Sequence, residues 1–345
     1  MPPPTSPSRI LHHLGGVLDK RRLKKGVVPL TVVVIGSTGF TGRHVTIELL
    51  NRGHTVVGIA RTPTAIGKRD NYKPIKIDIL SGQTAELGSI FSQADVVVKY
   101  VLISVWTGRV QAHTSSSAFG PHFGTDISYK FYMEAVRQVL LAFKLATRRR
   151  PFERPYLIVI GGTGSLIMPG TGGVNVVDYD PFWLDYVRSI SRSAVHVAYC
   201  KEINRTFGEM MENYREILMK GERANEDQFE QMKRYEEAMT NMDHDFVRAC
   251  CTSYLFYDGN ESFDWTFISP PAMYCPGKRT GEYDVHMQDS LPLPAEEGDV
   301  LPGISASDMA IVIADEAERK GMKWKHWTAT ADQSDDRLVP TYPTI

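Results

Sequence analysis

Three glycines mark the stretch of the chain whose residue types and spacing are best suited to chemistry. Gly36, Gly39 and Gly42 stand three positions apart, directly after a run of β-branched residues at 31–35. Glycine adopts backbone angles that side chains forbid and lets the chain approach a ligand closely. A helix that starts at such a turn aims its N–H groups and the positive end of its dipole at an anion, and a pyrophosphate fits that place. The three glycines therefore predict a dinucleotide-binding turn.

The elements around the glycine turn are those that a dinucleotide site needs. The run at 31–35 lacks polar alternation, which is typical of a parallel strand covered on both faces. We expect strands near 32–36, 55–60, 74–78, 96–103, 156–160, 264–269 and 326–331, and helices near 42–52, 84–92, 127–148 and 306–320. This alternation predicts an α/β fold, a Rossmann-like doubly wound parallel sheet with a small C-terminal substrate lobe and an inserted helical hairpin.

Longer motifs extend the comparison beyond the turn. The spacing G-x-x-G-x-x-G is joined by LIVIGGTGSLIMPG at 157–170, DWTFISPPAMYCPGKRTGEY at 264–283 and ISASDMAIVIADEAE at 304–318. Together they resemble the atypical short-chain dehydrogenase/reductase family, in particular its NAD(P)H-binding group related to NmrA-like and biliverdin reductase B-like proteins. The resemblance covers residues 30–190 and 243–331 and implies a nicotinamide cofactor.

The resemblance also implies which residues bind that cofactor. Ser37, Thr38, Phe40 and Thr41 complete the phosphate turn through backbone N–H groups and hydroxyls. Arg61 stands at the end of the second strand, where a site selective for NAD carries an acidic residue, and an arginine there can grip a 2′-phosphate. The other cofactor-binding candidates are Asp78 and Ile79 near the adenine, and Gly161, Gly162 and Pro270 toward the nicotinamide. We therefore expect NADP(H) as the cofactor and no metal.

The catalytic pair of the wider family has no convincing match in this sequence. Familiar members use a Tyr-x-x-x-Lys pair, in which the lysine lowers the pKa of the tyrosine for proton transfer. The one match, Tyr72 with Lys76, contains a proline and leads into a strand, so we attribute it to chance. The remaining candidates for proton transfer are His244, Tyr199 and Ser165. A histidine titrates near working pH, although a lone histidine is more often structural.

One stretch interrupts the alternation and predicts an insertion. Between about 191 and 243 the chain is long and charged, and apolar residues recur at helical spacing on both sides of a break at 220–227. Asn225 and Gln228 fit a helix-capping pair at the start of the second helix. We expect two antiparallel helices, whose apolar stripe serves hairpin packing, a lid over the substrate or an oligomer contact. The other predicted parts are a flexible tail at 1–26, a single NAD(P)-binding Rossmann domain at 27–335 and a C-terminal tail at 336–345.

Composition and charge narrow the class of protein. The 345 residues are 42% hydrophobic and 23% charged with a net charge of −1, which disfavours nucleic acid as the main partner. No apolar run reaches the ~18 residues that a membrane span needs. Four cysteines without metal or disulfide spacing favour a reducing compartment, so we expect a cytoplasmic protein. A mitochondrial transit peptide at the basic N-terminus is the alternative.

These observations predict an NADPH-dependent oxidoreductase that acts on a small, largely apolar carbonyl or conjugated substrate. The expected partner is this substrate, with no nucleic acid and no membrane, and the inserted hairpin is a candidate contact for a homo-oligomer. The apolar substrate is inferred from aromatic residues in predicted loops, namely Trp106, Phe119, Phe123, Phe182, Trp183 and Tyr186. Two alternatives stay open: a non-redox isomerase, dehydratase or cyclase that retains its cofactor, and an NmrA-like protein that senses NADP(H) and binds a partner.

Overall fold

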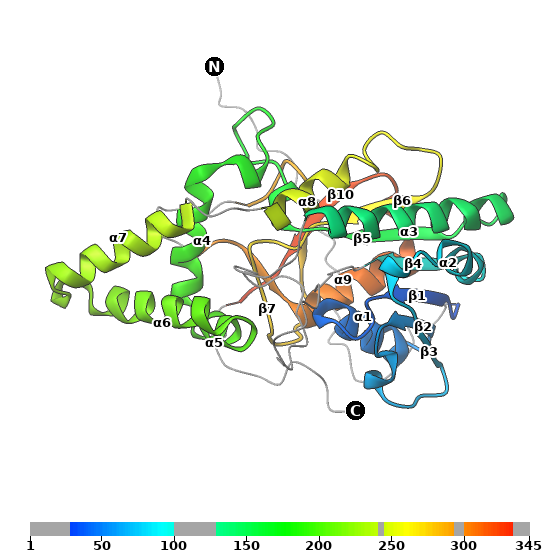
Figure 1. The fold of residues 1–345 in the computed structure, drawn as a ribbon, viewed down its shortest axis with the longest axis horizontal. Coiled ribbons are helices and arrows are strands. Elements are labelled where there is room, and N and C mark those ends of the chain that lie inside the picture. Colours follow the sequence, from blue (N-terminus) through cyan, green and yellow to red (C-terminus); the bar gives the residue numbers. More distant parts are fainter. Residues whose placement is uncertain (1–27, 100–128, 241–244, 293–299, 334–345) are drawn as a thin grey trace, which may run out of the picture.

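The protein is built on one large sheet whose two faces are covered by helices (Figure 1). The computed structural model describes residues 28–99, 129–240, 245–292 and 300–333. The sheet has eight strands in the order β3-β2-β1-β4-β5-β6-β10-β8. Their bounds are β1 (Thr31–Ile35), β2 (Thr55–Ala60), β3 (Tyr72–Lys76), β4 (Val96–Lys99), β5 (Tyr156–Ile160), β6 (Trp265–Ile268), β8 (Asp284–Met287) and β10 (His326–Thr330). All neighbouring pairs are parallel except β10 and β8. This is the doubly wound order, so the predicted fold class is confirmed.

The strands are continuously apolar because both of their faces are buried. Val32 and Val34 point into one layer of core, and Val33 and Ile35 point into the other. Helices α1 (Phe40–Asn51) and α9 (Ala306–Arg319) cover the first face, while α2 (Thr84–Phe91), α3 (Tyr129–Arg149) and α8 (Asp245–Tyr254) cover the second. Each predicted strand and helix of the sheet begins within two residues of its expected start. The part of the expected strand 96–103 beyond Lys99 lies outside the described residues.

The insertion contains more helices than the sequence predicted. Helices α6 (Arg205–Lys220) and α7 (Glu226–Thr240) form the expected hairpin, which Figure 1 shows projecting away from the sheet. Asn225 Oδ1 accepts from the N–H of Gln228 at 2.9 Å, and Gln228 Oε1 accepts from the N–H of Asn225 at 3.1 Å, so the capping pair is confirmed. Two helices that we did not predict, α4 (Asp180–Arg192) and α5 (Ala194–Ile203), precede the hairpin.

The insertion shares a core of its own with a small second sheet. Phe207 and Tyr214 of α6 lie in one apolar cluster with Trp183 of α4 and Met273 of β7. Strand β7 (Met273–Cys275) pairs in parallel with β9 (Gly303–Ser305) outside the large sheet. Part of the apolar stripe of the insertion therefore serves packing within the protein, which was the first of the three interpretations of this stripe. Phe182 and Trp183 are buried in the same cluster, which makes them core residues rather than lining for a substrate.

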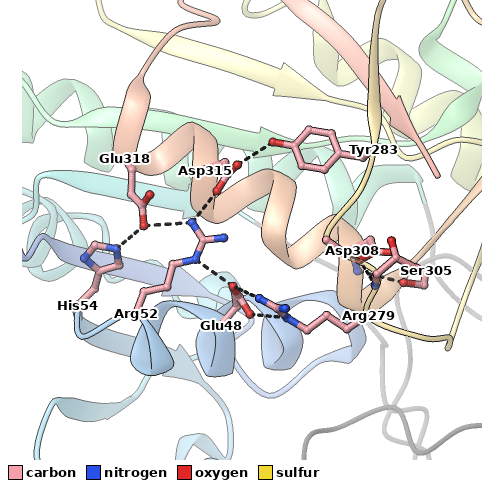
Figure 2. A network of polar contacts seen from close by, with 11 residues as sticks. Glu48, Arg52, His54, Arg279, Tyr283, Ser305, Asp308, Asp315 and Glu318 are labelled. Carbon is pink, nitrogen blue, oxygen red and sulfur yellow. Dashed lines mark hydrogen bonds and ion pairs between the residues drawn. The ribbon is translucent and has the colours of Figure 1, made fainter. Parts of the chain in front are cut away.

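A network of charged side chains holds α1 against α9 (Figure 2). Arg52, just past the end of α1, donates to Glu48 at 2.9 Å, to Asp315 at 2.7 Å and to Glu318 at 3.0 Å. Arg279, from the loop after β7, donates to Glu48 at 2.9 Å. Apart from Arg279, which is more than half exposed, these groups are largely buried, and in such surroundings ion pairs with several hydrogen bonds fix geometry more than exposed pairs do. The far end of α1 is thereby tied to an element about 260 residues later in the chain.

Lys99 is a charged residue type inside the second layer of core. Its side chain is 1% exposed, and its Nζ lies 5.7 Å from the ring centroid of Tyr132 and 5.9 Å from that of Tyr257. Within the described ranges no hydrogen-bond acceptor reaches this Nζ. Burial lowers the pKa of the Lys99 amine to about 7, because the charged form is poorly solvated there.

We expect Lys99→Met to stabilise the protein in a pH-dependent way. An unfolded lysine titrates near 10.4, so between pH 7 and pH 10 the unfolded chain binds more protons than the native chain. Wild-type stability therefore rises with pH in this range, and the advantage of the methionine variant falls from on the order of 4 kcal/mol at pH 7 to about 1 kcal/mol near pH 10. Denaturant titrations of both proteins across this range measure the difference. Lys73 is exposed, so Lys73→Met is the matched control. If the free energy of unfolding changed with pH in the same way in Lys99→Met and in wild type, the buried amine with a lowered pKa would be contradicted.

Candidate functional site

The three glycines of the turn have three different structural roles. Gly36 has φ 77°, the left-handed region that glycine favours, and turns the chain at the end of β1. Gly39 is the N-cap of α1, with φ −72° and ψ 173°, and its N–H donates to the Gly36 carbonyl at 3.0 Å. At Gly42 a Cβ atom would lie 2.0 Å from the Gly36 carbonyl oxygen. Gly42 is therefore required for packing, while Gly39 stands where a ligand would approach.

Backbone N–H groups at the start of α1 are placed to face an anion. The first helical hydrogen bond runs from the Arg43 N–H to the Gly39 carbonyl at 2.8 Å. The N–H groups of Phe40, Thr41 and Gly42 precede it, and the glycine cap supplies no side-chain acceptor for them. A phosphate at this end of α1 would accept these hydrogen bonds and meet the positive end of the helix dipole. The cradle thus fits the pyrophosphate of a dinucleotide.

The hydroxyls of Ser37 and Thr41 in the glycine turn form contacts inside the protein. Ser37 Oγ lies 3.3 Å from the hydroxyl of Tyr72, and Thr41 Oγ1 lies 2.8 Å from the hydroxyl of Tyr274. Both Ser37 and Thr41 are fully buried. The two side chains point into the protein, and contact of Ser37 and Thr41 with phosphate stays a prediction. Thr38 is half-buried and remains a candidate.

Tyr199 lies against the glycine turn rather than at a position suited to proton transfer. Its ring stacks on Phe40 with centroids 5.1 Å apart, and Phe40 also meets Tyr274 edge to face at 5.5 Å. Tyr199 is 4% exposed and belongs to the core layer under α1 and α9. Helix α5 of the insertion therefore packs directly on the first residue of the phosphate-binding helix.

Two arginines gather at the expected adenosine end. Arg61 follows β2 directly and is exposed, as a group that meets a ligand should be. Arg43 of α1 donates to the Ala65 carbonyl at 2.9 Å, which places its guanidinium over the loop that follows Arg61. The glycine turn and this loop lie at the carboxyl ends of neighbouring strands, where ligands of doubly wound sheets bind. Positive charge thus stands where a site selective for NAD carries an acid.

Asp78 is engaged in a turn at the end of β3. Its Oδ1 accepts from the N–H of Leu80 at 3.0 Å and so caps the short 3₁₀ helix Ile79–Ser81. Ile79 is buried beneath this turn. The turn-forming role of Asp78 is therefore observed, and contact of Asp78 and Ile79 with adenine stays a prediction.

The loops after β5 and β6 are bound to each other at the expected nicotinamide end. The Gly161 N–H donates to the Ile268 carbonyl at 2.8 Å, and Thr163 Oγ1 donates to the Pro270 carbonyl at 2.6 Å. A Cβ on Gly161 would lie 2.1 Å from the Phe267 ring, so glycine is required there by packing. Gly161, Gly162 and Pro270 are thus brought together, as the sequence predicted.

Ser165 ends a buried chain of hydrogen bonds. Ser165 Oγ lies 2.8 Å from Ser269 Oγ, which lies 2.8 Å from Nε2 of His326. His326 Nδ1 lies 2.9 Å from Oε1 of Gln288. The two serines and the histidine are at most 3% exposed. Burial lowers the pKa of His326 to about 3, so this imidazole is neutral at ordinary pH.

The three candidates for proton transfer do not converge on one point. Ser165 Oγ contacts Gly162 O, Ser269 Oγ and His326 Nε2, which uses the three hydrogen bonds that a hydroxyl can make. The partners of Ser165 lie on the α8 side of the sheet, whereas Tyr199 lies on the α1 side. His244 lies outside the described residues. Neither Ser165 nor Tyr199 is therefore poised to deliver a proton.

Sequence reasoning missed the residues that surround the candidates. Ser269, His326 and Gln288 complete the chain to Ser165, and Tyr274 holds Thr41. The only sequence signal for Ser269 is its place next to Pro270 at the end of a predicted strand. The sequence signal for His326 was weaker still, a histidine at the start of a predicted strand. Its contact with Ser165, about 160 residues away, cannot be inferred from sequence spacing.

Comparisons with known proteins agree with this geometry. Residues 32–114 match the model of the NAD dependent epimerase/dehydratase family. Residues of this chain are 32% identical, over 83 positions, to 4-hydroxy-tetrahydrodipicolinate reductase of Natronomonas pharaonis, a match that spans 24% of this chain and 30% of that enzyme. The uncharacterized protein YwnB of Bacillus subtilis is 23% identical over 305 residues, 88% of this chain and 99% of its own length.

A solved structure shows the same fold over most of the chain. A proposed NADH-flavin reductase from Streptococcus pneumoniae superposes with a TM-score of 0.51 at 18% identity, covering 88% of this chain and all of that one. The large sheet and the glycine turn define a Rossmann-type fold, and the family match at residues 32–114 agrees with the resemblance to atypical short-chain dehydrogenases/reductases.

The described residues hold neither a cluster of metal ligands nor a membrane-spanning helix. Across the described ranges no three His, Cys, Asp or Glu side chains gather as metal ligands would. None of the helices in the part of the chain that the structure describes is long and apolar enough to cross a membrane.

We expect substitutions at Gly42 and Gly39 to separate folding from binding. Gly42→Ala places a methyl group against the Gly36 backbone carbonyl and should destabilise the protein by at least ~2 kcal/mol. Gly39→Val keeps allowed backbone angles, so the protein should fold normally while nucleotide affinity drops by more than tenfold because the pyrophosphate is blocked. Thermal unfolding and calorimetric nucleotide titration measure the two effects. Wild-type nucleotide affinity in folded Gly39→Val would refute the turn as the phosphate site.

Proposed function

We propose that this protein is an NADP(H)-dependent oxidoreductase that reduces or oxidises a small, largely apolar carbonyl or conjugated substrate. The observation that carries the proposal is the pairing of the glycine cradle with Arg43 and Arg61 at the next strand end. The cradle selects a dinucleotide, and the arginines favour the cofactor that bears a 2′-phosphate.

The redox part of the proposal draws on the curated relative that is itself a reductase. Its match spans less than a third of its length, so it supports a reductase-type chemistry more than a particular substrate. The apolar substrate has less support than before, since Phe182 and Trp183 are core residues and Trp106, Phe119 and Phe123 lie outside the described residues. Tyr186 packs on Phe182 with centroids 5.9 Å apart.

The chain's own residues bind and orient the cofactor in this proposal. The N–H groups at the start of α1 hold the pyrophosphate, and Arg61 and Arg43 hold the 2′-phosphate. The backbone of Gly161, Gly162 and Pro270 forms the floor on which the nicotinamide ring rests. Bound there, NADPH would supply a hydride to the substrate. The proton that completes a reduction comes from water or from a residue outside the described ranges, because Ser165 and Tyr199 are engaged elsewhere.

We expect wild-type protein to prefer NADPH over NADH by about ten- to a hundredfold. A charge-assisted hydrogen bond is worth on the order of 1.5–3 kcal/mol, and about 1.4 kcal/mol corresponds to a factor of ten. Arg61→Asp should reverse the preference, because the carboxylate repels a 2′-phosphate and accepts a hydrogen bond from a 2′-hydroxyl. Arg43→Ala serves as the matched variant for the second arginine. Calorimetric titration with both nucleotides decides the matter, and equal wild-type affinities would refute the assignment.

We expect transfer of the cofactor's own hydride when a true substrate is supplied. With deuterium at C4 of NADPH, one deuterium should enter each product molecule for each cofactor oxidised. Aromatic aldehydes and enones, which keep the transferred deuterium on carbon, are the panel of probes. Product formed without label and without loss of NADPH would overturn the oxidoreductase reading in favour of an isomerase, dehydratase or cyclase. Tight NADP(H) binding with no turnover, but with capture of a protein partner that depends on the nucleotide, would favour the sensor.

A further inference from the structure

The chain from Ser165 to Gln288 joins four segments that are far apart in the sequence. Ser165 belongs to the loop after β5, Ser269 to the end of β6, His326 to the start of β10, and Gln288 follows β8. Such a set of groups is costly to bury unless every member has its partners, and here each has at least one at 2.9 Å or less. Neither the phosphate site nor the adenosine end uses this chain.

The outer end of the chain holds the loop that we expect beneath the nicotinamide. Ser165 Oγ donates to the Gly162 carbonyl at 2.8 Å, so the chain reaches the backbone of the glycine pair directly. On its other side the same loop is bound to the strand β6 end through Thr163 and Pro270. Two glycines in succession would otherwise leave this loop with wide conformational freedom.

His326 is the central member because its ring fixes the direction of the hydrogen bonds. Ser165 donates its one hydroxyl proton to the Gly162 carbonyl, so it accepts from Ser269, and Ser269 in turn accepts from the protonated Nε2 of the neutral imidazole. Nδ1 is then the acceptor nitrogen, which requires the side-chain amide of Gln288 to turn its N–H₂ group toward the ring. The ring is held in place by Tyr254, 4.3 Å away between centroids, and by Phe267 at 5.0 Å.

We propose that the Ser165–Ser269–His326–Gln288 chain is a brace that positions the Gly161–Gly162 loop to receive the nicotinamide half of the cofactor, with His326 as the positioning residue at its centre. The proposal rests on the proposed function, since it assigns the nicotinamide to this loop. It gives Ser165 a positioning role in place of the catalytic one considered from the sequence. A buried histidine that merely fills space would affect the whole fold, not one half of a ligand.

The test compares NADPH with 2′,5′-ADP, which carries the adenosine half and the 2′-phosphate but no nicotinamide. In His326→Leu we expect NADPH affinity to fall about tenfold while 2′,5′-ADP affinity stays within a factor of two of wild type. His326→Gln is the conservative control, because its amide N–H₂ group can donate to Ser269 near the position of Nε2. It should recover most of the NADPH affinity. Ser165→Ala should reproduce part of the loss, and it provides the measurement if the leucine variant fails to fold.

NMR of the His326 ring gives a second measurement that distinguishes NADPH from 2′,5′-ADP. In a ¹⁵N NMR spectrum the Nε2 of His326 should show the shift of a protonated nitrogen. That shift should move on addition of NADPH and stay unchanged on addition of 2′,5′-ADP.

The outcomes separate the brace from the cofactor assignment. Equal losses for both ligands in Ser165→Ala and in folded His326→Leu, or no loss for either, would overturn the brace while leaving NADP(H) binding intact. An unprotonated Nε2 in the free protein would also overturn it, because Ser165 could then not donate to the Gly162 carbonyl and to Ser269 at once. Wild-type protein that binds neither NADPH nor 2′,5′-ADP would refute the proposed function itself, and the brace with it.

Discussion

The close approach of the Gly42 backbone to the Gly36 carbonyl governs the rest of the structure. Because no Cβ fits between them, α1 can begin directly at the end of β1, with its first N–H groups at the carboxyl edge of the sheet. Every other part of the site is placed relative to that edge. The winding of the sheet reverses between β1 and β4. On one side of this point Arg61 follows β2, near Arg43 of α1, and on the other side the glycine pair follows β5.

The insertion and the late part of the chain secure that arrangement from outside. Tyr199 of α5 and Tyr274 of β7 pack on the side chain of Phe40, so the first residue of α1 is held in an aromatic cluster. At the other end of α1, Arg52 and Glu48 bind groups of α9 and of the loop after β7 (Figure 2). The phosphate-binding helix is therefore held at both ends by residues that no dinucleotide motif specifies.

The sequence predicted the elements whose signals are local. β-branched runs, helical spacing and the Asn225–Gln228 capping pair were sufficient for seven of the eight strands of the large sheet, for α1, α2, α3 and α9, and for the inserted hairpin, whereas β8 was not predicted. Sequence spacing did not predict the direction of side chains: Thr41 turns inward to Tyr274, and Ser165 to a chain that ends on Gln288. The short strands β7 and β9 were not predicted either, because three residues are too few to show an alternation of apolar and polar side chains. Such strands pair only through tertiary contacts. Candidate residues could thus be named, but their roles required the distant partners.

The interlocking of α1 with α9 has a consequence for how the chain acquires its structure. The glycine cradle lies within the first 50 residues, yet the groups that hold its helix lie beyond residue 270, and β10 is inserted between β6 and β8. Contacts of such long separation form late and slowly, because the loop that they close is most of the chain. During synthesis an emerging amino-terminal half would have the motif without its support. The nucleotide site should therefore be completed only after almost the whole chain has left the ribosome, and until then the exposed strands would depend on chaperones.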